Sequence, residues 1–501
     1  MASDTELEPR AQAASNPLDC VSLEPKHDGI TTLLGRGHEI EIHELDKSGN
    51  IIQRWLHTPD NQIIPVLAKD KSNGFIFRSL REWRKVIYDA FLPVGFPHSV
   101  SDDYFAYQTF DSLQAFFSTI TALLANRALL QGLGVGDANS SATFALLLTI
   151  LKDAMSRVAT IVFAQQFGLR IEPDAKKYRF LADMFNDTAF FLELYSPYFG
   201  PYCKIVALTV GEALRALCGV SAGASKAALS VHFAKHDNLA ELNAKEASQE
   251  TAVGLVGLLV GTLLVRSVEN HESVVYLMIG LVFAHLWMNY LGVRSVCMTN
   301  LNRQRATILF HEYLKTGAVL TPAEVARREH IVLWSPVVCN RHGHRVARIE
   351  MARSYWHAMG GRQPHINIAI VDGPMHTQFI WSHSSRQVPI KILLWKGAEP
   401  VHAISSWFMA LEMAWLMDKG LGYTAKLDQI FCGENPRSSP WKLDAAPEGN
   451  EKGQDLEYRK RFDDPELWDA MAAKGWNLGS QAFETAAPVR LTAHPRGKKD
   501  Q

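Results

Sequence analysis

The stretch VVYLMIGLVFAHLWMNYLGV, Val274 to Val293, decides the fold class, because it carries no formal charge. Its length is close to the roughly 20 residues that a helix needs to cross a bilayer. A shorter apolar run, LVGLLVGTLLV, lies before it at Leu255–Val265. The segment RSVENHES joins the two runs, so we predict a hairpin of two apolar helices, the first lengthened into the polar stretch that precedes it.

Four further helical segments precede this hairpin. Glycine and proline divide them, which marks where regular helices break. Together with the hairpin helices, extended to Thr251–Val265 and Val274–Val293, they predict a helical bundle. The four are Ser112–Gly136, Ser141–Gly168, Lys176–Pro197 and Tyr202–His232.

Two pairs of glycines have the spacing GxxxG, which lets helix backbones approach closely in lipid. They are Gly219 with Gly223 and Gly257 with Gly261. The motif is weak evidence by itself, because it is common by chance in helices rich in glycine and alanine.

The flanks of the bundle differ from it in character. Before it, His38–Leu45 alternates as a strand does, and Asn50–His57 follows the turn Lys47-Ser48-Gly49, which predicts a hairpin. A helix over Leu80–Pro93 leads into the bundle. After the bundle we predict strands at His365–Gly373 and Val388–Gly397, an amphipathic helix at His402–Gly420 and a helical patch near Pro465–Lys474.

The fold class that we predict is mainly α: a multi-helix, membrane-associated bundle with a small N-terminal β element and a C-terminal α+β domain. Basic residues follow the last apolar helix at Arg294, Arg303 and Arg305, so the C-terminal domain is expected on the cytoplasmic side. The predicted organisation is a disordered tail at 1–35, a β-containing segment at 36–85, a helical core at 86–325, the α+β domain at 326–433 and a polar, largely irregular tail at 434–501.

Composition narrows the function classes. The 501 residues have a net charge of -1, which does not favour nucleic acid as a partner. The six cysteines are scattered without a CxxC, which fits a reducing compartment. The first residues lack the apolar core of a secretory signal, and their acids suit a transit peptide poorly. We therefore expect an intracellular membrane location, with the organelle undetermined.

Charged residues interrupt the apolar helices in a regular pattern. Arg179, Asp183 and Asp187 fall four residues apart, on one helical stripe. Ionisable groups at membrane depth are costly, so they should face the bundle interior and pair with one another. The candidate members of this network are Asp103, Gln108, Asp111, Lys152, Asp153, Arg157, Arg179, Asp183, Asp187, Lys226, Lys245, Glu246, Gln249 and Glu250.

Three interpretations of this network stay open. It can be a polar cavity that binds or passes a small molecule, a set of structural pairs that hold the helices in register, or a set of water-facing charges on soluble helices.

Two local predictions concern helix starts. Asp102 and Asp103 are expected in the first turn of a helix capped by Ser99 or Ser101. Asn243 and Glu246 have the spacing of a capping box.

Glu246 and Glu250 are four residues apart with like charge, so a cation should lie near them. Lys245, Arg157 and Lys226 are the candidates.

Motifs for known chemistry are mostly missing from the sequence. GLGVGD lacks the GxGxxG spacing, GASK lacks the phosphate-loop frame, and no H-E-x-x-H occurs. A G-x-S-x-G occurs once, at Gly219–Gly223, but inside a segment predicted as helix and not at the strand-to-helix turn that a hydrolase needs. Cys339, His342 and His344 can ligate a metal but lack a clear fourth ligand, so an exposed loop is the preferred interpretation. We assign no catalytic residue and no metal site, and leave the cofactor undetermined.

Four long motifs resemble those of the root UVB-sensitive (RUS) family, in the order of the family, over Leu92 to Leu320. They are LPVGFPHSVSDDYFAYQTFDSLQA, FLADMFNDTAFFLELYSPYF, GVSAGASKAALSVHFAKHDNLAELNAKEASQET and NRQRATIL. The usual NMADVSAKDGSQET of the family appears here as NLAELNAKEASQET, so Glu246 replaces an aspartate and Ala247 a glycine. The charge is kept and a flexible point is lost.

The resemblance implies a multi-helix, membrane-associated protein without an established catalytic activity. It also implies a link to vitamin B6 homeostasis and to the UV-B response of roots. As partners it implies the lipid bilayer and a homo- or hetero-oligomer with another RUS-family protein. We therefore expect a non-enzymatic membrane protein of metabolic homeostasis. The alternatives are a transporter of a small polar or anionic metabolite and a soluble helical enzyme of unknown reaction.

Overall fold

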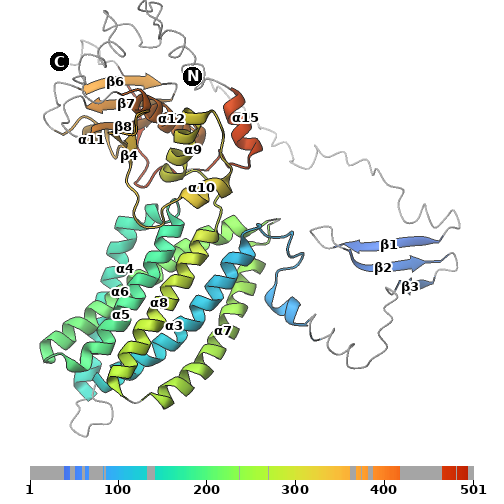
Figure 1. Ribbon diagram of the computed structural model, residues 1–501, viewed down its shortest axis with the longest axis vertical. Coiled ribbons are helices and arrows are strands. Elements are labelled where there is room, and N and C mark those ends of the chain that lie inside the picture. The colour runs from blue at the N-terminus through green and yellow to red at the C-terminus, as the bar shows by residue number, and fades with distance from the viewer. Residues whose placement is uncertain are drawn as a thin grey trace, which may run out of the picture. The chain divides into compact units, whose positions relative to one another are not determined.

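The computed structural model describes residues 39–45, 51–58, 62–66, 83, 86–132, 142–235, 237–268, 270–361, 368–373, 375–381, 387–417, 465–480 and 482–494. The chain forms two compact units (Figure 1). The first comprises 1–89 and 94–98, and the second comprises 90–93 and 99–501. The predicted tail at 1–35, the turn at 47–49 and residues 434–464 lie outside the described residues.

The first unit holds a three-stranded antiparallel sheet in the order β1 (Ile40–Leu45), β2 (Ile51–His57) and β3 (Ile63–Pro65). Ile40 pairs with His57, so the predicted hairpin is confirmed. β3 was not predicted, because its three residues are too few to show the polar–apolar alternation of a strand. Residues 86–91 are helical, within the segment predicted as a helix.

Six long helices form the bundle of the second unit, and each runs opposite to the one before it in the chain (Figure 1). All six were predicted. α3 begins 8 residues before the segment predicted from Ser112, and α7 begins 12 residues before the segment predicted from Thr251 and 4 before the capping box predicted at Asn243. Buried polar side chains lie in both early segments, Gln108 in α3 and Glu246 in α7. The bounds are α3 (Tyr104–Gly132), α4 (Ala142–Ile171), α5 (Ala175–Tyr195), α6 (Pro201–Phe233), α7 (Leu239–Ser267) and α8 (His271–Ser295).

Four of these helices, α3, α6, α7 and α8, are long and apolar enough to cross a membrane, judged by length and composition. Their outer faces carry exposed large apolar side chains. Leu263 of α7 is 65% exposed, and Phe283 of α8 is 68% exposed. A soluble monomer rarely exposes so much apolar surface.

The GxxxG pair of α7 faces α3. A Cβ atom at Gly257 would lie 3.2 Å from the carbonyl oxygen of Phe116, and one at Gly261 would lie 3.5 Å from the Cα of Ile120. The two backbones are therefore as close as small residues allow. Gly219 and Gly223 have no atom within 4 Å of such a position, so their spacing serves no close packing.

The C-terminal α+β domain contains a six-stranded mixed sheet in the order β4-β5-β8-β7-β6, with β9 beside β8. β8 pairs in parallel with β5 and β9, and the other pairs are antiparallel. The strands are β4 (Val337–Cys339), β5 (Arg345–Met351), β6 (Ile368–Gly373), β7 (His376–Trp381), β8 (Val388–Trp395) and β9 (Arg490–Leu491).

Helices α9 (Arg303–Thr316) and α12 (Pro400–Leu416) pack with this sheet in one apolar core. The rings of Phe310 and Phe408 lie 4.6 Å apart between the two helices, and Ile390 of β8 is fully buried. The shorter helices are α10 (Pro322–Arg328), α11 (Tyr355–Ala358) and α15 (Pro465–Ala473).

The predicted fold class is confirmed: a mainly helical bundle with four long apolar helices, a small N-terminal sheet and a C-terminal domain of sheet and helices. Only β6 and β8 of the C-terminal sheet were predicted. The domain boundaries remain predictions.

Candidate functional site

Arg179, on α5, is the centre of a polar network buried inside the helical bundle. Its Nη2 donates to Asp111 Oδ1 at 2.7 Å and to Gln114 Oε1 at 2.8 Å, both on α3. Its Nη1 donates to Asp183 Oδ1 at 3.3 Å, one turn further along α5. The planar guanidinium thus joins two helices through several hydrogen bonds, which a lysine ammonium could not do in the same geometry.

The network continues to α8 through His285 and Asn289. His285 is fully buried, and its Nδ1 lies 2.9 Å from Asp187 Oδ2. Its Nε2 lies 3.2 Å from Gln114 Nε2. Asn289 Nδ2 donates to the carbonyl oxygen of Arg179 at 3.2 Å and also to the Asp183 carboxylate.

Three carboxylates, those of Asp111, Asp183 and Asp187, share one guanidinium and one imidazole in this network. Removing one partner from a buried set of this kind leaves an uncompensated charge, which costs about 3–5 kcal/mol. These side chains connect α3, α5 and α8. Arg179, Asp183 and Asp187, which were predicted to share one stripe of α5, are buried inside the bundle.

A second polar cluster lies at the end of the bundle where α3 begins. Asp103 Oδ2 lies 2.9 Å from His232 Nε2, at the end of α6, and accepts from the Cys297 backbone N–H at 2.6 Å, after α8. Burial raises the pKa of Asp103, but the contacts with His232 and with the Cys297 N–H outweigh it and lower that pKa to about 2. Asp103 therefore ties three segments together at one end of the bundle.

The predicted place of Asp102 and Asp103 in a first helical turn is wrong. α3 begins at Tyr104, and the Asp103 carbonyl accepts the Tyr107 N–H, which is the role of the residue before the helix. The Asp103 side chain makes tertiary contacts instead of capping backbone N–H groups.

The predicted capping box at Asn243 is also wrong. α7 begins at Leu239 and its cap residue is Asn238, so Asn243 lies in the second turn. Asn238 donates instead to the Ser99 carbonyl, which joins the start of α7 to the segment before α3.

The two glutamates of α7 have different environments. Glu250 is 3.0 Å from Lys226 Nζ on α6, at an exposed position, so Lys226 supplies the expected cation. Glu246 is only 2% exposed, and its Oε1 has no hydrogen-bond partner among the described residues. Gln108 of α3 is also buried with an unpartnered Oε1.

The other candidates on α7 and α4 lie apart from this network. Gln249 donates to the Phe91 carbonyl, and Lys245 is partly exposed. Lys152 of α4 forms a 3.2 Å ion pair with Glu212 of α6. Asp153 and Arg157 are exposed on α4. Neither of the last two forms an ion pair with any residue that the structure describes.

A third cluster joins the bundle to the C-terminal domain. The Glu329 carboxylate accepts from Lys176 Nζ of α5 at 2.6 Å and from Arg305 Nη1 of α9 at 2.9 Å. All three side chains are at most 5% exposed. Burial raises the pKa of Glu329, but the two cations outweigh it, and the pKa lies below its usual value.

Sequence reasoning missed the partners that face these residues. Gln114, His285 and Asn289 were not placed in the network, because periodicity gives the face of a helix and not its neighbour. His232 gave no signal beyond lying within a family-like motif. Glu329 lies after the helical segments and gave none.

The chemistry of the network is that of paired charges and amides. Over the residues that the structure describes, no group of three or more His, Cys, Asp or Glu side chains has an arrangement that could hold a metal ion. The sulfur of Cys339 therefore has no such cluster around it.

Comparison with known proteins identifies relatives over the bundle. A family model described as "Vitamin B6 photo-protection and homoeostasis domain" matches residues 78–317. The chain is similar to "RUS family member 1" of Dictyostelium discoideum, with 36% identity over 300 residues, or 58% of this chain and 55% of the relative. It is also similar to "Protein root UVB sensitive 3" of Arabidopsis thaliana, with 31% identity over 346 residues, or 68% of this chain and 78% of the relative.

A further Arabidopsis thaliana relative, "Protein root UVB sensitive 2, chloroplastic", is 29% identical over 243 residues, or 48% of this chain and 55% of the relative. The chain thus spans about half the length of two of these relatives. No solved structure matches the chain.

Proposed function

Because this chain belongs to the root UVB-sensitive (RUS) family, we propose that it is a membrane protein of vitamin B6 homeostasis that acts without catalysing a reaction. One observation carries the proposal. The family match at 78–317 falls on the six-helix bundle, which contains the four long apolar helices and holds the Arg179 network inside. In this role the network is a structural anchor, and the apolar outer faces contact lipid.

Membrane insertion is tested by alkaline carbonate extraction of membranes from cells that express the full chain. The protein should remain in the pellet, because apolar helix faces keep it in the bilayer after peripheral proteins are stripped. Release into the supernatant would contradict the membrane part of the proposal. We propose that the protein lies in an intracellular membrane. Density-gradient fractionation of the same cells identifies the organelle.

The metabolic role is tested in cells that lack the protein, by quantifying the vitamin B6 vitamers with and without UV-B exposure. Altered vitamer levels should return to normal with the wild type. Unchanged levels in the deletion would contradict the role. Conversion of one vitamer into another by the purified protein would contradict the non-enzymatic part alone.

A second candidate function, a carrier for a small polar or anionic metabolite, is favoured by two buried oxygens without a hydrogen-bond partner among the described residues, that of Gln108 and that of Glu246, which interacts electrostatically with Lys226. Flux into proteoliposomes should then fall with Lys226→Ala and stay unchanged with Lys235→Ala, which alters an exposed lysine that is 3.9 Å from Asp102. Equal flux in both variants would rule out a role for Lys226 in transport.

A further inference from the structure

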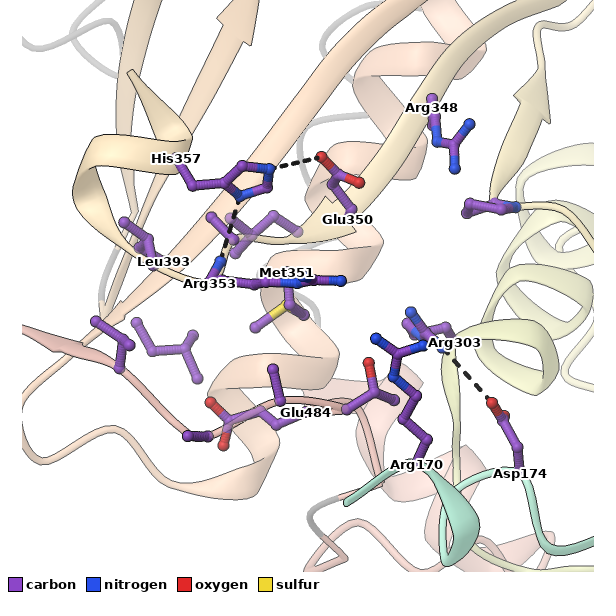
Figure 2. Close-up of a pocket in the computed structure, with 18 of the residues that line it drawn as sticks. Arg170, Asp174, Arg303, Arg348, Glu350, Met351, Arg353, His357, Leu393 and Glu484 are labelled. Atoms are coloured by element: carbon purple, nitrogen blue, oxygen red, sulfur yellow. Dashed lines mark hydrogen bonds and ion pairs between the residues drawn. The ribbon is translucent and has the colours of Figure 1, made fainter. Parts of the chain in front are cut away.

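A cavity of about 420 Å³ lies where the bundle meets the C-terminal domain. We call it the junction cavity. Its lining comes from the end of α4, the starts of α5 and α9, strands β5 and β8, and the segment before β9 (Figure 2). The volume is within the range of small-molecule sites in proteins.

The lining of the junction cavity is rich in cations, and its carboxylates are already paired. It includes three carboxylates, and each has a cation within ion-pair distance. The pairs are Asp174 with Arg303 at 3.6 Å, Glu350 with Lys391 at 3.8 Å and Glu484 with Arg490 at 2.6 Å.

Four more cations line the cavity without a carboxylate partner among the residues that the structure describes: Arg170, Lys177, Arg348 and Arg353. Figure 2 shows Arg170 and Arg303 reaching the cavity from the helices, and Arg348 and Arg353 from the side of the sheet. Guanidinium groups converging from different elements suit an anion with several oxygens, because each can donate two parallel hydrogen bonds.

Two helices also begin at the junction cavity. α5 starts at Ala175 and α9 starts at Arg303, so both positive dipole ends face this region. Asp174, at the cap position of α5, makes no side-chain cap hydrogen bond, which leaves N–H groups of the first turn without that partner. Phosphate commonly binds at such a helix start.

The environment of Arg303 favours an anionic ligand. Burial lowers the pKa of Arg303; the Asp174 and Glu350 carboxylates raise it, and the neighbouring Arg170 guanidinium lowers it again. The net direction is down, so these carboxylates do not compensate for the burial and the second cation.

Part of the remaining lining is apolar. It includes Tyr178 from α5, Met351 from β5, Leu393 from β8 and Val489 beside β9. An inorganic ion alone would leave this wall uncovered, whereas a phosphate ester can place its organic part against it.

We propose that the junction cavity binds a phosphomonoester of a small, partly apolar organic group, with Arg170 and Arg353 among the residues that bind its phosphate. The phosphomonoester can belong to a soluble metabolite or to the headgroup of phosphatidic acid. The inference does not depend on the proposed role in vitamin B6 homeostasis.

The test uses the purified full-length protein in detergent, with isothermal titration and thermal stability as readouts. Pyridoxine 5′-phosphate should bind and raise the melting temperature, pyridoxine should do neither, and inorganic phosphate should compete. Arg353→Gln should weaken binding at least tenfold, because one charge-assisted contact is lost. Arg353 is exposed and has no carboxylate partner among the described residues, so this variant should fold.

Arg345→Gln is the matched control, because Arg345 lies on β5 at an exposed position and does not line the cavity. It should bind as the wild type does. Equal weakening in both variants would show a general effect of net charge and overturn the site.

Vesicles with phosphatidic acid, set against vesicles of phosphatidylcholine alone, distinguish the source of the phosphate. Arg353-dependent binding of these vesicles without binding of the soluble ester assigns the site to the lipid headgroup, and the reverse assigns it to a metabolite. Absence of Arg353-dependent binding with inorganic phosphate, the soluble ester and phosphatidic acid would overturn the proposal while leaving the vitamin B6 role intact.

Discussion

At the scale of single residues, Arg179 connects two helices inside the bundle. It is 9% exposed and contacts carboxylates on both α3 and α5. Sequence spacing was enough to place it on one stripe with Asp183 and Asp187. It was not enough to find Gln114 and His285, because residues on other helices are brought together by tertiary packing and not by periodicity.

Arg179→Met should destabilise the bundle by about 3–5 kcal/mol, because Asp111 and Asp183 lose their buried cation. Thermal unfolding in detergent measures the change. The matched control is Arg157→Met, since Arg157 is exposed on α4. A similar loss in both variants would contradict the central place of Arg179.

Acid should weaken the contact of Asp103 with His232. The pKa of Asp103 in the folded protein, about 2, is lower than its ordinary value of 3.8, so ionisation of this carboxylate stabilises the fold above pH 3.8. This contribution, on the order of 2 kcal/mol, is lost as the pH falls from about 4 to about 2.

The measurement compares the wild type with Asp103→Asn across this pH range. The gap in unfolding free energy should be largest above pH 4 and should shrink towards pH 2. Asp102→Asn is the control, because the Asp102 side chain is fully exposed. If the gap did not change with pH, the low pKa of Asp103 would be wrong.

At the scale of elements, α7 shows where pattern reading succeeds and where it fails. Its apolar half and its GxxxG spacing were recognised, and Gly257 and Gly261 do face α3. Its apolar part was placed from Thr251 and its start at the capping box of Asn243, whereas α7 begins at Leu239. In these polar turns Glu246 is buried and Glu250 pairs with Lys226 of α6, and such tertiary contacts are not encoded by local preference.

Gly257→Leu should push α7 away from α3 and destabilise the bundle by about 1–3 kcal/mol, the usual cost of overpacking. A backbone carbonyl stands 3.2 Å from the added Cβ and cannot move aside as a side chain can. Thermal unfolding in detergent is the readout.

Gly223→Leu serves as its control, because a Cβ there has open space and the position is exposed. Equal melting temperatures for the two variants would mean that the close approach of α7 and α3 contributes little.

At the scale of the whole molecule, the sequence predicted the bundle better than the C-terminal domain. Long apolar helices carry a strong signal, whereas β4, β5, β7 and β9 are short or mixed in polarity and pair across distant parts of the chain. The junction cavity was missed for the same reason. Its arginines come from α4, α9, β5 and the segment after β5, which only the tertiary fold brings together.

The alternating directions of the six helices predict that the chain before α3 and the chain after α8 lie on one side of the membrane. Contacts agree with this: Cys297, after α8, donates to Asp103, just before α3. Tags at both ends of the chain should be digested together by protease added to sealed vesicles, or be protected together. The basic residues after α8 favour the cytoplasmic side. Digestion of one tag alone would contradict this topology.

The late position of Glu329 in the chain has a consequence for folding during translation. Lys176, at the start of α5, leaves the ribosome more than 150 residues before Glu329 does. Until Glu329 has been made, the nascent bundle contains Lys176, and later Arg305, without the carboxylate that pairs with both in the folded protein. Burial of these two cations would therefore be uncompensated. This end of the bundle should therefore stay hydrated during translation and close only when the C-terminal domain docks. A truncated chain that ends before Glu329 should therefore be degraded by quality-control proteases faster than the full chain, although it contains all six helices of the bundle.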